Sequence, residues 1–295
     1  MTLIELITAQ SARLKQAGVC FGHGTTNAFD ESAWLVLWAL GMPLESLEQH
    51  ARRQLDDAEQ NRAQALVTRR IESRQPAAYL THEAWLQNVP FFVDERVIVP
   101  RSYIAELLAD AESEGTLDAW LSDETHKMLD LCTGSGCLAV IAAMAYPEVT
   151  VDAADLSTAA LEVARINVDK HKLAKRITLI ESDLFASVRG PYDLIVCNPP
   201  YVNSASMKAL PPEFCAEPAL ALGGGDDGMD LVRNIIRDAH HHMSDAAVLV
   251  LEIGHERRHF EQAFPRLEVA WLETSGGQDQ VLLVTRDGLT RWGQR

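Results

Sequence analysis

The sequence predicts an α/β protein in which a mostly parallel, doubly wound sheet follows a small helical domain. Three observations support this fold class. Strand-like runs alternate with amphipathic helices from about residue 127 onward, a glycine-rich turn directly follows the first of these runs, and the first 80 residues carry apolar residues at helical spacing. The chain has 295 residues, of which 47% are hydrophobic, so it can bury a sizeable core.

The first part of the chain, residues 1–80, is predicted to be a small helical domain. Apolar residues recur near a 3.6-residue period over residues 3–14 and again over 55–71. Asp30 is a candidate N-cap for a helix over residues 31–40. A domain of this size and composition can fold as a few packed helices.

Residues 81–100 are predicted to be a β-hairpin linker. The triplets 91–93 and 97–99 are aromatic or β-branched, and they flank the polar residues 94–96, as two short strands flank a turn. We therefore place the junction of the two domains here and expect the second domain over residues 101–295.

The second domain is predicted to contain seven strands with helices between them. The strand candidates are residues 127–132, 149–154, 176–180, 192–197, 247–253, 267–271 and 280–285. The glycine-rich run 223–228 is a predicted loop, followed by a helix over 229–243. Alternation of this kind favours a mostly parallel sheet with helices on both faces.

The turn after the first strand is a candidate cofactor site. It consists of Asp130, Leu131, Cys132, Thr133, Gly134, Ser135 and Gly136. Glycines here permit a tight turn and let a ligand approach bare backbone. Ala139 stands where the dinucleotide-binding pattern requires its third glycine, so a pyrophosphate site is not predicted.

Acidic residues follow the next two strands. Asp155 lies about twenty residues beyond the glycine turn, where a carboxylate can accept hydrogen bonds from both ribose hydroxyls. Asp183 ends the third strand and can accept from an adenine amine, while Leu184 can contact the ring. A simpler role for Asp155 or Ser157 is to cap the helix over 158–170. The order and spacing of these residues favour a nucleoside site.

The tetrad Asn198-Pro199-Pro200-Tyr201 follows the fourth strand and predicts the chemistry. Two prolines fix φ and remove two backbone donors, which leaves carbonyls free to face a ligand. The Asn198 side chain and the Pro199 carbonyl can accept both N–H bonds of a planar NH2 group, and Tyr201 can stack on it. Such acceptors orient the nitrogen lone pair towards a sulfonium methyl. We therefore predict S-adenosyl-L-methionine-dependent methylation of an amide or amine nitrogen.

Composition narrows the class of partner and the compartment. With 42 acidic and 26 basic side chains, the net charge of −16 disfavours general nucleic-acid binding and favours a basic protein partner. Five cysteines at no zinc-ligand spacing indicate reduced thiols in the cytoplasm. No apolar run approaches the roughly 20 residues of a membrane span, and we expect neither a membrane nor an export signal. His240–His242 point in different directions on a helix, so no metal site is predicted.

Taken together, these residues resemble the protein glutamine N5-methyltransferase family. The resemblance covers nearly the whole chain and rests on the order of its parts, on the tetrad, and on Glu217-Pro218-Ala219-Leu220 with Gly228. It implies a class I methyltransferase domain of Rossmann-like fold over residues 101–295, and substrate recognition by the helical domain. It also implies that Asn198 to Tyr201 hold the target glutamine.

The same resemblance assigns further roles and a branch. It implies that the turn from Asp130 to Gly136, with Asp155, Asp183 and Leu184, holds the cofactor. Arg101 and Glu217 either line the substrate entrance or form a purely structural salt bridge. The linker ending in Pro100-Arg101-Ser102 is similar to the branch that modifies ribosomal protein L3 (uL3). The resemblance implies that the protein binds basic L3 before or during assembly of the large subunit. The opposite charges of the two proteins would speed their association.

Three alternatives remain open at this stage. A methyltransferase of peptide chain release factors would perform the same reaction on another protein. An N6-adenine methyltransferase of nucleic acid would use a similar tetrad on a similar planar NH2 group. A cofactor-binding ribosome assembly factor would need the fold but not the chemistry.

Overall fold

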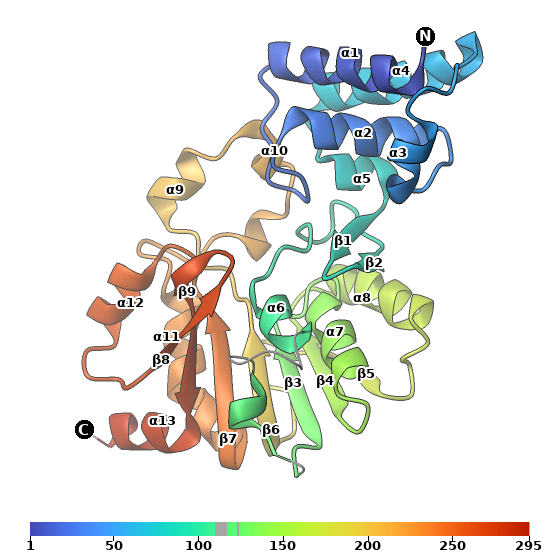
Figure 1. Cartoon of the computed structure of the whole chain (residues 1–295). Coiled ribbons are helices and arrows are strands. Elements are labelled where there is room, and N and C mark those ends of the chain that lie inside the picture. The colour runs from blue at the N-terminus through green and yellow to red at the C-terminus, as the bar shows by residue number, and fades with distance from the viewer. Residues whose placement is uncertain (110–116, 123, 295) are drawn as a thin grey trace.

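A computed structural model describes residues 1–109, 117–122 and 124–294 of the chain. Its strands are β1 (Ala84–Leu86), β2 (Val89–Phe91), β3 (Lys127–Leu131), β4 (Thr150–Asp155), β5 (Ile177–Glu181), β6 (Tyr192–Cys197), β7 (Met243–Glu252), β8 (Ala270–Thr274) and β9 (Gly277–Thr285). The last seven form one sheet in the order β5-β4-β3-β6-β7-β9-β8 (Figure 1). Strands β3 to β7 are parallel to one another, whereas β9 runs antiparallel to β7 and β8. The prediction of a mostly parallel, doubly wound sheet is confirmed.

Helices cover both faces of this sheet (Figure 1). They are α6 (Ile104–Ala109), α7 (Cys137–Ala145) and α8 (Thr158–Lys170) on one face, and α11 (Asp230–Asp238), α12 (Arg257–Ala263) and α13 (Arg286–Gly293) on the other. Successive residues of the central strands serve opposite cores: in β6, Leu194 and Val196 pack beneath α7, while Ile195 and Cys197 pack beneath α11. Burial on both faces explains why apolar residues stand at consecutive positions in the central strands, as in residues 194–197 of β6.

The N-terminal part of the chain is helical, as predicted. It contains α1 (Leu3–Gln16), α2 (Ala28–Ala39), η1 (Leu44–Ser46), α3 (Leu47–His50), α4 (Asp57–Ser73) and α5 (Ala77–Thr81). Helices α1 and α4 each begin with a capping box, in which Thr2 pairs with Glu5 and Asp56 pairs with Glu59. The prediction that Asp30 caps α2 is wrong. Asn27 is the cap, because its side chain accepts from the N–H groups of Phe29 and Asp30, so the helix begins earlier.

The linker hairpin lies a few residues earlier than its aromatic triplets suggested. Strands β1 and β2 pair across Gln87-Asn88, which both have positive φ, as a tight two-residue turn requires. Residues 94–96 form a separate turn, and Phe92 bonds to Asn167 of α8 instead of to a partner strand. Val93, Val97 and Val99 are β-branched because they fill a core shared by the N-terminal helices and α8.

Two other boundaries differ from the sequence prediction. The helix expected over 229–243 is α11 followed by the short η4 (Ala239–His242), and β7 already begins at Met243. Elsewhere the seven predicted strands differ from the observed ones mainly at their ends. The remaining helical turns are η2 (Leu117–Trp120), α9 (Ser204–Lys208), α10 (Pro212–Cys215) and η3 (Ala219–Ala221).

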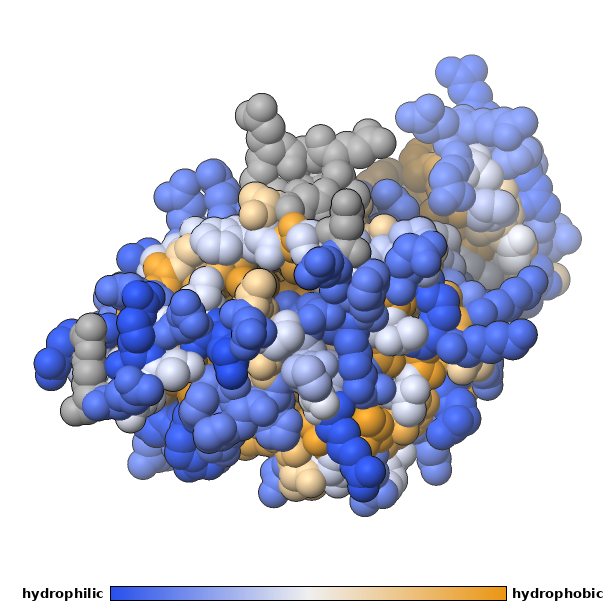
Figure 2. All heavy atoms as spheres, turned by 90° about the horizontal axis from the view of Figure 1, so that it is seen from below, coloured by the Kyte–Doolittle hydropathy of each residue, from blue (hydrophilic) through white to orange (hydrophobic). Residues whose placement is uncertain are grey.

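The end of the molecule opposite the N-terminal helices carries mostly hydrophilic residues, with hydrophobic ones visible between them (Figure 2). None of the described helices is long and apolar enough to cross a membrane. The parallel strands end at the other side, beneath the linker, where β3 and β6 diverge to helices on opposite faces (Figure 1). A ligand site is expected at this switch point.

Candidate active site

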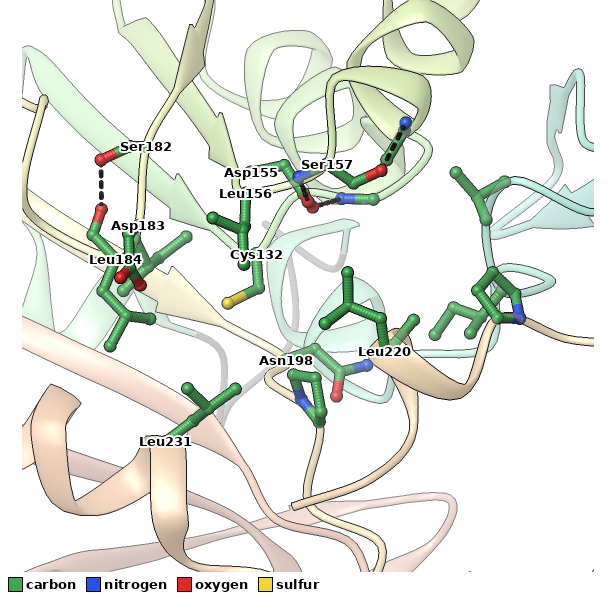
Figure 3. A pocket seen from close by; sticks show the side chains of 18 of the residues that line it. Cys132, Asp155, Leu156, Ser157, Ser182, Asp183, Leu184, Asn198, Leu220 and Leu231 are labelled. Atoms are coloured by element: carbon green, nitrogen blue, oxygen red, sulfur yellow. Dashed lines mark hydrogen bonds between the residues drawn. The ribbon is translucent and has the colours of Figure 1, made fainter. Parts of the chain in front are cut away.

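A pocket with an empty volume of about 780 Å³ lies at the switch point. Its walls come from the ends of β3 to β6, from the linker and from the segment after the tetrad (Figure 3). The described residues that line it are Arg96, Val97, Ile98, Leu131, Cys132, Gly134, Asp155, Leu156, Ser157, Ala160, Ser182, Asp183, Leu184, Asn198, Pro200, Pro218, Leu220, Ala221 and Leu231. The structure thus brings together Cys132, Gly134, Asp155, Asp183, Leu184, Asn198 and Pro200, as the sequence predicted.

Asp155 is fixed at the end of β4 by two backbone donors. The Gly134 N–H donates to Oδ2 at 2.8 Å, and the Ser157 N–H donates to Oδ1 at 2.8 Å (Figure 3). Burial raises the pKa of Asp155, while these N–H groups favour the charged form. Ser157, not Asp155, caps α8 by accepting from the Ala160 N–H at 3.2 Å. Asp155 therefore keeps lone pairs that can accept from a ligand.

Asp130 holds the glycine turn from beneath. Its Oδ2 accepts from the Thr133 hydroxyl at 2.5 Å and from the Ala139 N–H at 3.0 Å. Burial raises the pKa of Asp130 to about 7. Neither Asp130 nor Thr133 is among the described residues that line the pocket. They shape the turn instead of facing a ligand.

Ser135 and Gly136 contact helix α8 behind the turn. The Ser135 carbonyl accepts from the side-chain amide of Asn167 at 2.9 Å. Gly136 has φ +78°, and a Cβ placed there would lie 3.1 Å from the Cβ of Ala164. Glycine is thus required here by backbone conformation and by the close approach of α7 to α8, and neither residue is among the described pocket lining.

The end of β5 supplies one polar and one apolar group. Asp183 is exposed within the pocket, and Leu184 lies beside it with φ +46° (Figure 3). The Ser182 hydroxyl donates to the Leu184 carbonyl at 2.7 Å and accepts from the Ser187 N–H at 2.9 Å, which fixes this turn.

Apolar side chains that the sequence analysis missed complete the pocket. Leu156, Leu220 and Leu231 come from three separate elements and surround its centre (Figure 3). Leu156 and Leu220 are 54% and 61% exposed, so both side chains have apolar surface available to a ligand. A signal for both was in the sequence, since Leu156 follows Asp155 directly and Leu220 ends the run Glu217-Pro218-Ala219-Leu220.

The tetrad spans from the pocket to the buried end of β7. The Asn198 side chain lies in the pocket and makes no hydrogen bond to any residue that the structure describes (Figure 3). Pro199 is buried, and it and Tyr201 are not among the described lining residues. The Tyr201 hydroxyl donates to Glu252 Oε1 at 3.2 Å, and its ring lies against Gly254.

Glu252 is a buried residue at the end of β7 that the sequence analysis did not single out. Its other oxygen, Oε2, accepts from the Ser102 hydroxyl at 2.6 Å and the Tyr103 N–H at 2.9 Å. Burial raises the pKa of Tyr201, and the adjacent Glu252 carboxylate raises it further, so the phenol remains a donor. Glu252 thereby joins the tetrad to the linker.

Arg101 and Glu217 form a two-point ion pair. The guanidinium donates to both carboxylate oxygens, at 2.6 and 2.7 Å, and Glu217 also accepts from the Val99 N–H at 2.8 Å. Burial would raise the pKa of Glu217, but the neighbouring His23 and Arg101 hold it at about 2. Of the two roles considered for this pair, the geometry fits the structural one: neither residue is among the described lining of the pocket.

Comparison with known proteins decides the family. The ribosomal protein uL3 glutamine methyltransferase of Bordetella pertussis is 52% identical to this chain over 291 residues, which cover 98% of this chain and 96% of the relative. The chain belongs to the ribosomal protein uL3 glutamine methyltransferase family. The protein of the same name from Neisseria meningitidis serogroup B is 48% identical over 290 residues, which cover 98% and 94%. The resemblance drawn from the tetrad and the linker is confirmed.

Family and fold comparisons agree with this assignment. Residues 109–245 match the methyltransferase small domain family, and residues 5–81 match the PrmC N-terminal domain family. The crystal structure of the hMettl16 catalytic domain in complex with MAT2A 3'UTR hairpin 6 superposes with a TM-score of 0.52 at 14% identity and covers 84% of this chain and 90% of that one. At such low identity the likeness bears on the fold alone, which is that of a class I, Rossmann-like methyltransferase. The protein is a methyltransferase, and this class of enzyme uses S-adenosyl-L-methionine.

Proposed function

We propose that the protein transfers a methyl group from S-adenosyl-L-methionine to the side-chain amide nitrogen of a glutamine in ribosomal protein uL3. The observation that carries the proposal is the position of Asn198. Its side-chain amide, without a hydrogen-bond partner among the described residues, lies in the same pocket as the strand-end carboxylate of Asp155. Relatives that are named for this reaction cover 98% of the chain.

The pocket fits a nucleoside that carries a positively charged sulfur on its tail. The fixed carboxylate of Asp155 would accept from the ribose hydroxyls, and Asp183 from the adenine amine. Leu156, Leu184 and Leu220 would cover the faces of the base. When bound, S-adenosyl-L-methionine supplies a methyl group on a positively charged sulfur.

The tetrad would bind and orient the glutamine amide. Asn198 Oδ1 and the Pro199 carbonyl would accept its two N–H bonds, which turns the nitrogen lone pair towards the methyl group. Tyr201 would pack on the flat amide, with its ring held by Gly254 and its hydroxyl by Glu252. The proton released from nitrogen needs no strong base, since it becomes acidic once the new bond forms. The residues act by position and not by covalent chemistry.

We also propose that residues 1–80 recognise the protein substrate, that 81–100 form the linker and that 101–295 form the catalytic domain. A groove with an empty volume of about 680 Å³ supports recognition by the helical part; it is lined by Trp85 of the linker and by the helical-part residues Gly24, Thr25, Asp30, Ala33, Trp34, Leu37, Leu44 and Leu47. Of the described residues that line the groove, Asp30 is acidic and none is Lys or Arg, so the groove suits a basic segment of uL3.

The setting of the reaction follows from that substrate. We propose that the protein acts in the cytoplasm on uL3 before or during assembly of the large subunit, without direct contact to nucleic acid and without a metal ion. Among residues 1–109, 117–122 and 124–294, there is no group of three or more His, Cys, Asp and Glu side chains that could hold a metal. The net charge of −16 is unfavourable for binding a polyanion.

The test is methyl transfer with radiolabelled cofactor to purified uL3, to a peptide chain release factor, and to DNA and RNA. We expect label on one glutamine of uL3 and at most trace label elsewhere. Label on the release factor alone would show that the substrate is wrong, and label on nucleic acid alone would show that the target group is wrong. No label on any substrate, with assembly still dependent on the protein, would favour a binding role.

A further inference from the structure

One wall of the proposed cofactor pocket does not belong to a β-strand. Pro218, Leu220 and Ala221 form this wall, in a segment whose three helices each have three to five residues. An isolated bridge between Val202 and Gly223 closes the segment at its base. Leu220 is largely exposed, so burial of its own side chain does not fix the wall. Two buried carboxylates, those of Glu213 and Glu217, precede the wall in the sequence. Both form hydrogen bonds to residues outside this segment.

Glu213 reaches the N-terminal helices. Its side chain is fully buried, and Oε1 accepts from the Cys20 N–H at 3.1 Å. The same oxygen lies 3.0 Å from Nε of Arg74 and 3.5 Å from Nη1 of Arg70. These partners lie 139 to 193 positions earlier in the chain, in the loop after α1, in α4 and just after α4. One carboxylate therefore ties the pocket segment to two elements of the helical domain.

Arg70 links Glu213 to further residues of the helical domain. It is 0% exposed, and its Nε donates to Glu31 of α2 at 2.9 Å, while Nη2 donates to the Cys20 carbonyl at 3.0 Å. Glu31 also accepts from the Thr25 hydroxyl at 3.1 Å. The charges of two carboxylates, Glu31 and Glu213, are thus neutralised by the guanidinium groups of Arg70 and Arg74. Removing one member of this cluster leaves an unpaired charge.

Phe214 adds a packing contact between the pocket segment and the N-terminal part of the chain. The rings of Phe214 and His23 are 4.2 Å apart, and a Cβ on Gly22 would lie 3.2 Å from the Phe214 ring. The Arg101 guanidinium also lies over the Phe214 ring, 5.6 Å from its centre, and pairs with Glu217. The wall is thus held at one end by the helical domain and by the linker together.

We propose that Glu213 is a positioning residue for the cofactor pocket, through which the N-terminal helices hold the wall formed by Pro218, Leu220 and Ala221. This inference rests on the proposed function, because it takes the pocket to be the cofactor site. The helical domain then has a second role besides recognition of the protein substrate: it completes the pocket of the other domain. The strands keep their own ladders without this contact, so the wall can loosen while the sheet stays folded.

The test is cofactor binding by Glu213→Gln, measured by calorimetry, with amide hydrogen exchange over residues 213–222. Glutamine keeps the size of the side chain but removes the charge that holds Arg70 and Arg74. We expect the Kd for S-adenosyl-L-methionine to rise about tenfold and the wall amides to exchange faster, with exchange in β3 and β6 unchanged. The control is Glu261→Gln, which removes an exposed ion pair to Arg257 and leaves both readouts as in the wild type.

Glu31→Gln separates positioning from mere stability. It takes a carboxylate from the same Arg70 but does not touch the pocket segment. If Glu213→Gln and Glu31→Gln lower the melting temperature alike and both leave the Kd unchanged, the proposal is overturned. If Glu213→Gln does not fold, Arg74→Gln takes its place, because this residue is partly exposed; we expect its Kd to rise about threefold, and an unchanged Kd overturns the proposal. A wild-type protein that does not bind the cofactor would contradict the proposed function and this inference with it.

Discussion

The two sides of the cofactor pocket are held in different ways. On the strand-end side, Asp155 is fixed by backbone donors 2 and 21 positions away in the sequence. On the loop side, Glu217 and Glu213 fix the wall through partners that lie 116 to 193 positions away. The first side is built by the sheet itself, whereas the second depends on the linker and the helical domain. The pocket that we propose for the cofactor thus combines a local side with a long-range one, and each can be perturbed separately.

The largest effect is expected where the two sides meet, at Asn198. Replacing Asn198 by Ala removes the acceptor that orients the amide, and we expect kcat to fall by about 1,000-fold, since loss of one oriented polar group at a reacting centre costs about this much. The Kd for the cofactor should change by less than about threefold, because Asp155 and Asp183 remain. Steady-state kinetics and calorimetry measure the two effects. Asn61→Ala, an exposed change on α4, is the matched control.

The strand-end side is tested next by Asp155→Ala. Loss of a charged acceptor for two hydroxyl groups is worth about 3 kcal/mol, so we expect the Kd for the cofactor to rise about 100-fold. The melting temperature should fall little, because Ser157 still caps α8. Asp169→Ala, on the exposed face of the same helix, should leave the Kd as in the wild type. Equal Kd values for both variants would remove Asp155 from the site.

The loop side makes a prediction about pH through Glu217. Its pKa is about 2 in the folded protein against an ordinary value of 4.5, which corresponds to about 3 kcal/mol of stability. Since the folded pKa is the lower one, this contribution is complete above pH 4.5 and is lost as the pH falls towards 2. Denaturant unfolding of wild type and Glu217→Gln should therefore show a difference that shrinks by about 1.4 kcal/mol per pH unit below pH 4.5. A difference that stays constant from pH 6 to pH 3 would contradict the ion-pair account.

The smallest effect is expected at Gly136, which shapes the glycine turn but does not face the pocket. Gly136→Ala places a Cβ 3.1 Å from Ala164 at a φ of +78°, and we expect it to lower the unfolding free energy by about 2 kcal/mol. Gly18→Ala, at φ +61° with no atom within 4 Å of its Cβ among the described residues, should cost only the backbone strain, about 1 kcal/mol. Thermal unfolding gives both values. The cofactor Kd of Gly136→Ala should stay within about threefold of wild type, because the described lining of the pocket does not include it.

The same contrast explains what the sequence could predict. Strand ends, the glycine turn and Asp155 follow from periodicity and short-range spacing, so the fold class and the number of strands in the sheet were predicted, although β7 begins four residues earlier and β8 three residues later than expected. Seven of the predicted site residues line the pocket. The misplaced hairpin has a physical cause: β-branched residues are typical of strands, but Val93, Val97 and Val99 are fully buried in a core shared with the N-terminal helices and α8 instead of pairing as strands.

Contacts across the chain were the part that could not be predicted. Nothing near Glu213 in the sequence indicates Arg70, and nothing near Tyr201 indicates Glu252, since each pair meets only after the domains have packed. Asp130 and Thr133 were predicted to face the cofactor, but their side chains bond each other behind the turn. Sequence spacing identified the correct turn, and only the structure separates the residues that build it from those that face the pocket.

The central claim is that Asn198 orients a glutamine amide of uL3 for methylation. The most direct measurement is mass mapping of uL3 from cells that lack this protein and are complemented with wild type or with Asn198→Ala. The account predicts one methylated glutamine in uL3 with the wild type and an unmodified glutamine with the variant, although both proteins bind the cofactor. Full methylation with Asn198→Ala, or no methylation of uL3 with the wild type, would contradict it.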